Sequence, residues 1–201
     1  MNIGRNTEST AASDFVRDSM EASAKYVNSA SADLIQPTAH VAEIIIRVFR
    51  RGGKLLICGN GGSAADSQHI AAELVGRFRS ERRALPAIAL TTDSSILTAL
   101  ANDYEVAQMF SRQVRAAGHE GDVLLAISTS GSSPNVLAAV SEARSMSITT
   151  IGLTGADGDE LAAACDYAIK APAHETARIQ EIHIVLAHAF CGAIEAAFLD
   201  G

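Results

Sequence analysis

Residues 54–73 read K-L-L-I-C-G-N-G-G-S-A-A-D-S-Q-H-I-A-A-E, and this stretch decides the fold class. It begins with a short apolar run bounded by glycines, which is typical of a buried parallel strand. Glycines at 59, 61 and 62 allow backbone conformations that other residues avoid, and they let a ligand approach the main chain. Ser63 is then predicted to cap a helix, whose free N–H groups attract anions, phosphate above all.

Apolar runs that predict strands alternate with helical patterns along the rest of the chain. These runs cover residues 54–58, 86–90, 122–127, 148–153 and 166–170. Such alternation is typical of a parallel sheet with helices on both faces. We therefore predict an α/β fold with a five-stranded parallel sheet in a Rossmann-like three-layer sandwich.

Two helices are predicted ahead of the sheet. Apolar residues recur at helical spacing over residues 13–35, and Pro37 interrupts the pattern before a second amphipathic stretch over residues 40–49. Residues 1–12 are polar and are predicted to form a frayed end.

Composition excludes several classes of protein. The 201 residues are 48% apolar, which is enough to form the core of one domain, and the formal net charge of −7 argues against a nucleic-acid-binding surface. No segment has the apolar core of a signal peptide or the run of about 18 apolar residues that spans a bilayer. The three cysteines, Cys58, Cys165 and Cys191, show no metal-binding spacing and form no closed disulfide set. These features predict a cytoplasmic protein.

A second anion-binding loop is predicted at residues 128–133, S-T-S-G-S-S. It follows a predicted strand, and Pro134 suits the first turn of the helix that comes next. Because ligands bind beyond the carboxyl ends of the strands in such sheets, both loops are expected to face one site. Together they could hold a phosphate with neutral donors and helix dipoles, without Lys or Arg.

The sequence does not fit either of two common nucleotide-binding motifs. A P-loop would need Gly-Lys-Ser/Thr after the first loop, which is absent. Gly59, Gly61 and Ala64 match the looser dinucleotide fingerprint. That fold, however, expects an acidic ribose ligand about 20 residues further on, and Asp93 lies too far along the chain.

The residues suited to proton chemistry lie on two predicted helices. His69 and Glu73 are four residues apart and so share a helix face, either as an incidental pair in solvent or, since the helix starts at the first loop, as part of a site. Gln180 and His188 lie eight residues apart, about 12 Å along a second helix. Both could contact one ligand only if it lies lengthwise or spans a subunit boundary.

A basic cluster follows the first of these helices, made of Arg77, Arg79, Arg82 and Arg83. Cations near a helix carboxyl end complement its dipole and often face solvent. Only Arg77, one turn beyond Glu73, is assigned a possible functional role.

Four ordered motifs resemble the phosphoheptose isomerase (sedoheptulose 7-phosphate isomerase) family of SIS, or sugar isomerase, domain proteins. They are C-G-N-G-G-S-A-A-D-S-Q-H-I-A-A-E-L from residue 58, A-N-D-Y at 101–104, G-D-V-L-L-A-I-S-T-S-G-S-S-P-N-V at 121–136 and R-I-Q-E-I-H-I-V-L-A-H at 178–188. The resemblance covers nearly the whole chain. It implies a SIS domain over residues 51–201, preceded by a helical extension over residues 1–50 that packs in an oligomer.

The resemblance also implies an activity. Sedoheptulose 7-phosphate would be converted to D-glycero-D-manno-heptose 7-phosphate by proton transfer through an enediol. This is the first step of activated heptose biosynthesis, which serves lipopolysaccharide and other surface polysaccharides. Family members are homotetramers in which the amino-terminal helices pack together and the sites form at subunit contacts.

Site residues follow from the same resemblance. Those that contact the sugar phosphate would be Asn60, Gly61, Gly62 and Ser63, and those that hold its phosphate end Ser128, Thr129, Ser130 and Ser133. Asn102 and Asp103 would line the sugar. One zinc ion per subunit would be bound by His69, Glu73, Gln180 and His188, with Glu73 and Gln180 also contacting substrate. Glu73 would act as catalytic base and His188 as catalytic acid.

Three alternatives remain beside this interpretation. One is a non-catalytic SIS protein that binds a replication initiator or another protein partner; such proteins can lose the site carboxylate, whereas Glu73 is present here. The second is a regulator that senses sugar phosphates, which would need a DNA-binding module that residues 1–50 do not supply. The third is an isomerase for a different sugar phosphate, because the motifs define phosphate binding and proton transfer better than carbon-chain length.

Overall fold

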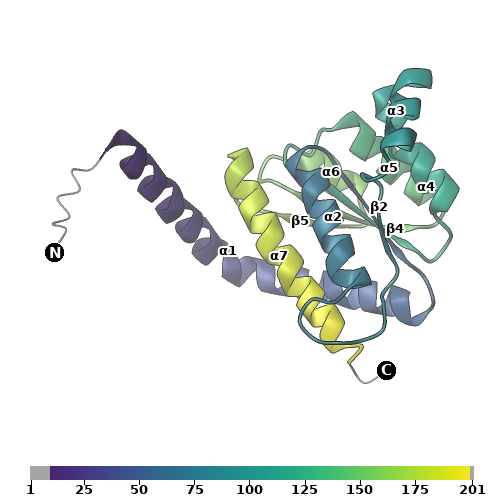
Figure 1. Ribbon diagram of the computed structural model, residues 1–201, viewed down its shortest axis with the longest axis horizontal. Helices are drawn as coiled ribbons and strands as arrows, with labels where there is room; N and C mark the ends of the chain where they lie inside the picture. Colours follow the sequence, from purple (N-terminus) through teal and green to yellow (C-terminus); the bar gives the residue numbers. More distant parts are fainter. Residues whose placement is uncertain (1–9, 200–201) are drawn as a thin grey trace, which may run out of the picture.

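The computed structural model describes residues 10–199, with the side chains of residues 29–31 excepted. Five parallel strands form one sheet, as predicted (Figure 1). The strand order is β2-β1-β3-β4-β5. The strands are β1 (Leu55–Gly59), β2 (Ala87–Ala89), β3 (Val123–Ser128), β4 (Thr149–Thr154) and β5 (Tyr167–Lys170). The chain leaves β1 toward β2 on one side and returns to β3 on the other. The order therefore reverses between β1 and β3, and in open α/β sheets ligands bind beside such a switch point.

Helices cover both faces of the sheet and confirm the three-layer arrangement. They are α1 (Ala11–Arg50), α2 (Gly62–Val75), α3 (Ser94–Asp103), α4 (Ser111–Ala117), α5 (Pro134–Ser145), α6 (Asp159–Ala164) and α7 (Thr176–Ala196), with a 3₁₀ turn at Val106–Gln108. One core lies between the sheet and helices α1, α2 and α7, and the other lies between the sheet and helices α4, α5 and α6. Within the described residues, no helix combines the length and the apolar character that crossing a bilayer requires.

Strand β1 shows why this sequence forms a central strand. Leu55 and Ile57 point into the first core, while Leu56 and Cys58 point into the second, because successive side chains of a strand alternate between faces. All four side chains are fully buried. Burial of each aliphatic side chain stabilises the fold by about 1.5–3 kcal/mol.

The amino-terminal region is helical as predicted, but it forms one helix rather than two. Pro37 lies inside α1, although a proline removes a backbone hydrogen bond and crowds the preceding turn. Packing outweighs this cost, because Leu34, Thr38 and Val41 around it are buried where α7 crosses α1. Figure 1 shows that α1 changes direction along its length, as expected of a helix that contains proline.

Helix α1 begins inside the segment that was predicted to be a frayed end. Thr10 and Ser13 form a capping box, in which the Ser13 N–H donates to Thr10 Oγ1 (3.2 Å) and the Thr10 N–H donates to Ser13 Oγ (2.9 Å). Helix therefore begins at Ala11, inside the segment predicted to be frayed. The remainder of that prediction, residues 1–9, lies outside the described residues.

Candidate active site

The first predicted phosphate loop joins β1 to α2, as expected, but its helix cap differs from the prediction. Gly61, with φ of 53°, occupies the N-cap position, and α2 begins at Gly62 without a side-chain cap. Ser63 is buried within the first turn and does not cap the helix. Glycine can adopt the positive φ that the turn into α2 requires, and having no side chain it leaves the amino end of the helix without a side-chain acceptor.

The second predicted phosphate loop brings serine hydroxyls together after β3. Ser128 Oγ lies 3.0 Å from Ser133 Oγ and 3.5 Å from Ser130 Oγ, and it accepts the Gly131 N–H (3.2 Å). Gly131 has φ of 68°, and a side chain at this position would collide with the main chain of Gly158. Helix α5 begins at Pro134, as predicted. The loop is thus a tight turn that gathers hydroxyl groups at the amino end of a helix.

A pair of amides connects the two loops. Asn60 Nδ2 donates to Asn135 Oδ1, and Asn135 Nδ2 donates to Asn60 Oδ1, each over 2.8 Å. Asn135, which is buried, was not singled out from the sequence. The two residues are 75 positions apart, so no local pattern could have revealed the contact.

Helices α2 and α7 lie side by side and run in the same direction. Near their amino ends Gln180 packs on Gly62, where a Cβ atom would stand 2.5 Å from Gln180 Nε2. Further along, His69 Nε2 lies 2.9 Å from His188 Nε2 and 3.4 Å from Glu73 Oε1. Three of the predicted site residues therefore meet, whereas Gln180 lies about 12 Å from His188 along α7.

Zinc was predicted to bind His69, Glu73, Gln180 and His188. Imidazole nitrogens and a carboxylate oxygen are donors that zinc accepts, so the side-chain types fit this metal. Their arrangement does not complete a site: in residues 10–199 no group of three or more His, Cys, Asp or Glu side chains is placed to hold a metal ion. Instead, the two imidazoles share a hydrogen bond, and Gln180 remains beside Gly62.

Asn102 and Asp103, the predicted sugar-lining residues, lie at the end of α3. Both are exposed, and Asn102 Nδ2 donates to Asp103 Oδ1 over 2.7 Å. Figure 1 shows α3 well apart from α7. A single chain thus does not bring these two residues to His188.

A small cavity of about 220 Å³ opens beside the second loop. Its lining residues are Thr129, Ser130, Asp157, His174, Thr176 and Ile179. His174 Nδ1 lies 2.7 Å from Asp157 Oδ2, so a histidine with no role assigned from the sequence stands next to the serine loop. The contact joins two connecting segments 17 residues apart, and no sequence motif marks it.

The basic cluster separates into exposed and buried members. Arg77, Arg79 and Arg83 are exposed, and a role for Arg77 stays a prediction. Arg82 was expected to face solvent but is buried, with its guanidinium directed at main-chain carbonyls near the end of α2. Buried acceptors at a helix end need a donor, and Arg82 supplies it.

The cysteines are unsuited to nucleophilic chemistry. Burial raises the pKa of all three thiols, those of Cys165 and Cys191 to about 12 and that of Cys58 further. A thiol with such a pKa does not form a thiolate near neutral pH. Proton chemistry at this site therefore falls to carboxylate and imidazole groups.

Known proteins are similar to this chain over most of its length. Residues 18–155 match the SIS domain. A phosphoheptose isomerase from Roseiflexus sp. is 50% identical over 190 residues, which is 94% of this chain and 96% of that protein. Another, from Aromatoleum aromaticum, is 53% identical over 182 residues, 89% of this chain and 92% of that protein. The chain belongs to the SIS-domain phosphoheptose isomerase family.

Solved structures of phosphoheptose isomerases share the fold. The one from Neisseria gonorrhoeae superposes with a TM-score of 0.88 at 45% identity, covering 92% of this chain and all of that chain. The one from Francisella tularensis gives a TM-score of 0.90 at 37% identity. Membership of the phosphoheptose isomerase family confirms the predicted reaction class, an aldose–ketose isomerisation of a sugar phosphate.

Proposed function

We propose that this family member converts sedoheptulose 7-phosphate to D-glycero-D-manno-heptose 7-phosphate, with Glu73 moving the proton between C1 and C2. The observation that carries the proposal is the cluster of Glu73, His69 and His188 on two adjacent helices that start at the phosphate-binding end of the sheet. Isomerisation through an enediol needs a base beside the reacting carbons, and a carboxylate held among imidazoles suits that task.

The two loops are proposed to hold the phosphate. The hydroxyls of Ser128, Ser130 and Ser133 and the amino ends of α2 and α5 supply donors without a cationic side chain. Binding energy from a phosphate remote from the reacting carbons can position those carbons for proton transfer. Asn102 and Asp103 are proposed to contact the sugar between the two ends.

The spacing along α2 supports a site shared between subunits. Glu73 lies eleven residues beyond Gly62, about 16 Å along the helix axis. This separation is longer than a seven-carbon sugar phosphate. We infer that the phosphate loop of one subunit works with the proton-transferring residues of a second subunit.

His188 is proposed to exchange protons with the substrate oxygens as charge shifts between them. Its Nε2 lies 2.9 Å from His69 Nε2, which in turn lies 3.4 Å from Glu73 Oε1, so His69 connects the proposed acid to the proposed base. Zinc, if held by His69, Glu73 and His188 together with Gln180, would polarise the carbonyl oxygen. The proposed base role of Glu73 does not depend on whether the metal is catalytic.

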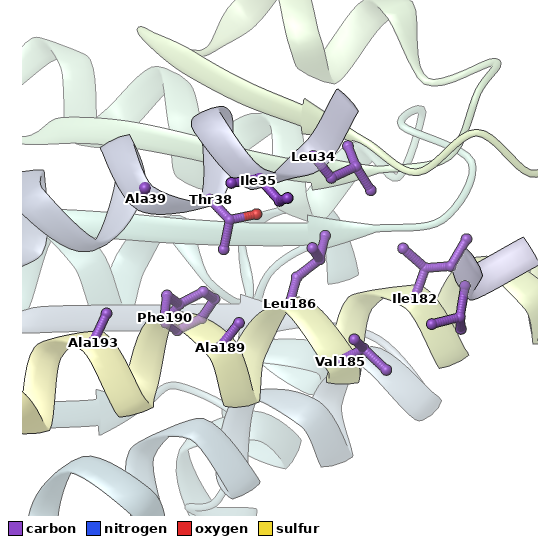
Figure 2. Close-up of a pocket in the computed structure, with 11 residues that line it drawn as sticks. Leu34, Ile35, Thr38, Ala39, Ile182, Val185, Leu186, Ala189, Phe190 and Ala193 are labelled. Atoms are coloured by element: carbon purple, nitrogen blue, oxygen red, sulfur yellow. The ribbon is translucent and has the colours of Figure 1, made fainter. Parts of the chain in front are cut away.

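An assembly of several copies is supported by the apolar surface of α1 and α7. An open groove of about 300 Å³ lies between these helices, lined almost entirely by apolar side chains (Figure 2). Beyond the groove, α1 exposes Phe15 by 75% and Met20 by 69%, and Ile35, in the groove itself, is 60% exposed. Helix α3 has no fully buried side chain, although Leu97 packs partly buried against the second core. We propose that α1, the described part of the extension predicted over residues 1–50, packs against other copies in a homotetramer. We also propose that the protein is cytoplasmic.

The test is NMR of the purified protein with sedoheptulose 7-phosphate in deuterated water. Heptose phosphate formation with deuterium at C2 is expected, because the enediol exchanges its proton with solvent. The assay is run with added zinc and again with a chelator. Turnover of ribulose or fructose phosphate, with sedoheptulose 7-phosphate inert, would show that the substrate assignment is wrong while the reaction class stands.

A further inference from the structure

An ion pair lies in the interior beside the proposed proton-transferring residues. Arg82 Nε stands 3.9 Å from Glu195 Oε2, and the two side chains are 0% and 5% exposed. Neither residue belongs to the site implied by the sequence motifs. Buried ion pairs contribute little net stability, because the cost of desolvation offsets their attraction. The effect of this pair therefore lies in the geometry that it imposes on the segments around it.

Glu195 ties the segment after α2 to α7. Its Oε2 accepts the N–H of Phe78 (2.8 Å), and its Oε1 accepts the N–H groups of Arg79 (2.9 Å) and Ser80 (2.8 Å). A single carboxylate on α7 thus holds three consecutive backbone donors. Hydrogen bonds to a charged acceptor are stronger than neutral ones, so this segment is fixed at close range to α7.

Arg82 ties the same segment to the end of α2. Its Nη2 donates to the carbonyl oxygen of Glu73 (2.7 Å), and its Nη1 donates to those of Gly76 (2.8 Å) and Arg83 (3.0 Å). The last carbonyls of a helix lack partners within the helix, and the planar guanidinium supplies several donors in fixed directions. The main chain of the proposed base is therefore held directly by Arg82.

The segment between them also covers the proposed acid. Phe78 packs on His188, with ring centroids 5.7 Å apart, and it reaches Gly192 on the next turn of α7. Glu73 and His188 are consequently linked through one network that runs from the α2 carbonyl through Arg82 and Glu195 to α7.

We propose that Arg82 and Glu195 are positioning residues for the isomerisation. They hold Glu73 on α2 at a fixed position relative to His188 on α7. Neither side chain touches the substrate; both act through the residues they hold. The inference rests on the proposed base role of Glu73. It predicts that loosening the pair slows proton transfer while phosphate binding, at the opposite end of α2, is kept.

The primary test is Glu195→Gln, which keeps the shape of the side chain but presents N–H groups where the Phe78 N–H needs an acceptor. The expected result is a fall in kcat of about 10-fold or more, with KM changed by less than about 2-fold, since small displacements of catalytic groups have effects of this size. Val140→Ala is the matched control: it removes buried volume in the core on the other face of the sheet. Both proteins are assayed well below their melting temperatures.

Two further variants keep the inference testable if Glu195→Gln does not fold. Arg82→Lys keeps the charge but loses the planar fork, and it is expected to lower kcat in the same way. Replacing both residues, as Arg82→Met with Glu195→Leu, removes both buried charges at once and is expected to fold more readily than either single truncation. A slow but folded double variant supports the positioning role, and wild-type turnover in any folded variant of the pair overturns it.

Glu73→Gln, measured in parallel, separates this inference from the proposed function. An active Glu73→Gln protein would remove the base role and the inference with it. An inactive Glu73→Gln protein, together with a Glu195→Gln protein that turns over like Val140→Ala, would leave the base role standing and refute only the positioning role.

Discussion

Asn60 and Asn135 hold each other through two reciprocal hydrogen bonds of 2.8 Å, across the point where the strand order of the sheet reverses. One residue begins the loop after β1, and the other lies in the first turn of α5 after β3. The pair therefore fixes the spacing between the two loops that are proposed to hold phosphate. Each amide both donates and accepts a hydrogen bond, so a side chain that can only donate or only accept cannot replace it.

Asn135→Asp is expected to weaken substrate binding more than turnover. The carboxylate cannot donate to Asn60 Oδ1, so one of the two hydrogen bonds is lost, and a negative charge is placed near the phosphate loops. We expect KM to rise about 10-fold with kcat nearly unchanged, and stability to fall by about 1–2 kcal/mol. Steady-state kinetics and urea unfolding measure both. Ser141→Asp, which adds the same charge at an exposed position of α5, is the control and should leave KM unchanged.

Glu73→Gln is expected to abolish isomerisation while the protein still binds sedoheptulose 7-phosphate. The amide keeps the size of the side chain but cannot take up the proton, and loss of a positioned base costs about 10²- to 10⁴-fold in rate. Deuterium exchange at C2 and isothermal titration with substrate measure the two effects separately. Glu160→Gln, an exposed acid on α6, should behave as wild type. Retained exchange in Glu73→Gln would assign the base role to another group.

The sheet could be predicted from the sequence because its strands are short, apolar and bounded by glycine, so that local pattern and burial agree. Leu55, Leu56 and Ile57 are buried on whichever face they point to, and no long-range information is needed to recognise them. One error in the helices came from Pro37, where a local rule predicts a break and packing against α7 overrides it.

The site could be predicted only where its residues share a local motif. His69 and Glu73 share a helix face, and their contact follows from helical geometry alone. The partners of Arg82 and Asn135 depend on how distant segments pack. Arg82 looks like any other cation after a helix, and only the fold shows that it is enclosed beside Glu195.

His183 is expected to make stability depend on pH in the weakly acidic range. Burial lowers its pKa from 6.5 to about 4, partly offset by the hydrogen bond from His183 Nε2 to the Thr154 carbonyl, and its Nδ1 has no partner among the described residues. The unfolded chain therefore binds the proton more readily between these values. The contribution is complete above about pH 6.5 and is lost as the pH falls toward 4, which amounts to about 1 kcal/mol between pH 7.5 and 5.5.

Urea unfolding at pH 7.5 and 5.5, at one fixed protein concentration, measures this difference. His183→Gln removes the titrating group, so the difference should shrink by about 1 kcal/mol in this variant even if the variant is less stable overall. His40→Gln serves as the control because His40 is exposed on α1. The difference in unfolding free energy between the two pH values should be the same in this variant as in wild type. An unchanged difference in His183→Gln would show that another group controls the acid response.

Val185→Glu is expected to break the proposed assembly. Val185 lies on the open side of the groove between α1 and α7 and is 44% exposed, so a carboxylate there is tolerated in a single chain but is buried without a partner when a second copy covers the groove (Figure 2). An unpaired buried charge costs several kcal/mol, which is enough to dissociate a protein interface of ordinary strength. Light scattering at fixed concentration should therefore show a species larger than the monomer for wild type and a smaller species for Val185→Glu. Ser141→Glu, exposed on the opposite side of the sheet, should keep the wild-type mass. Because the site is proposed to be shared between subunits, the dissociated variant should also lose turnover, and an active monomer would refute that part of the proposal.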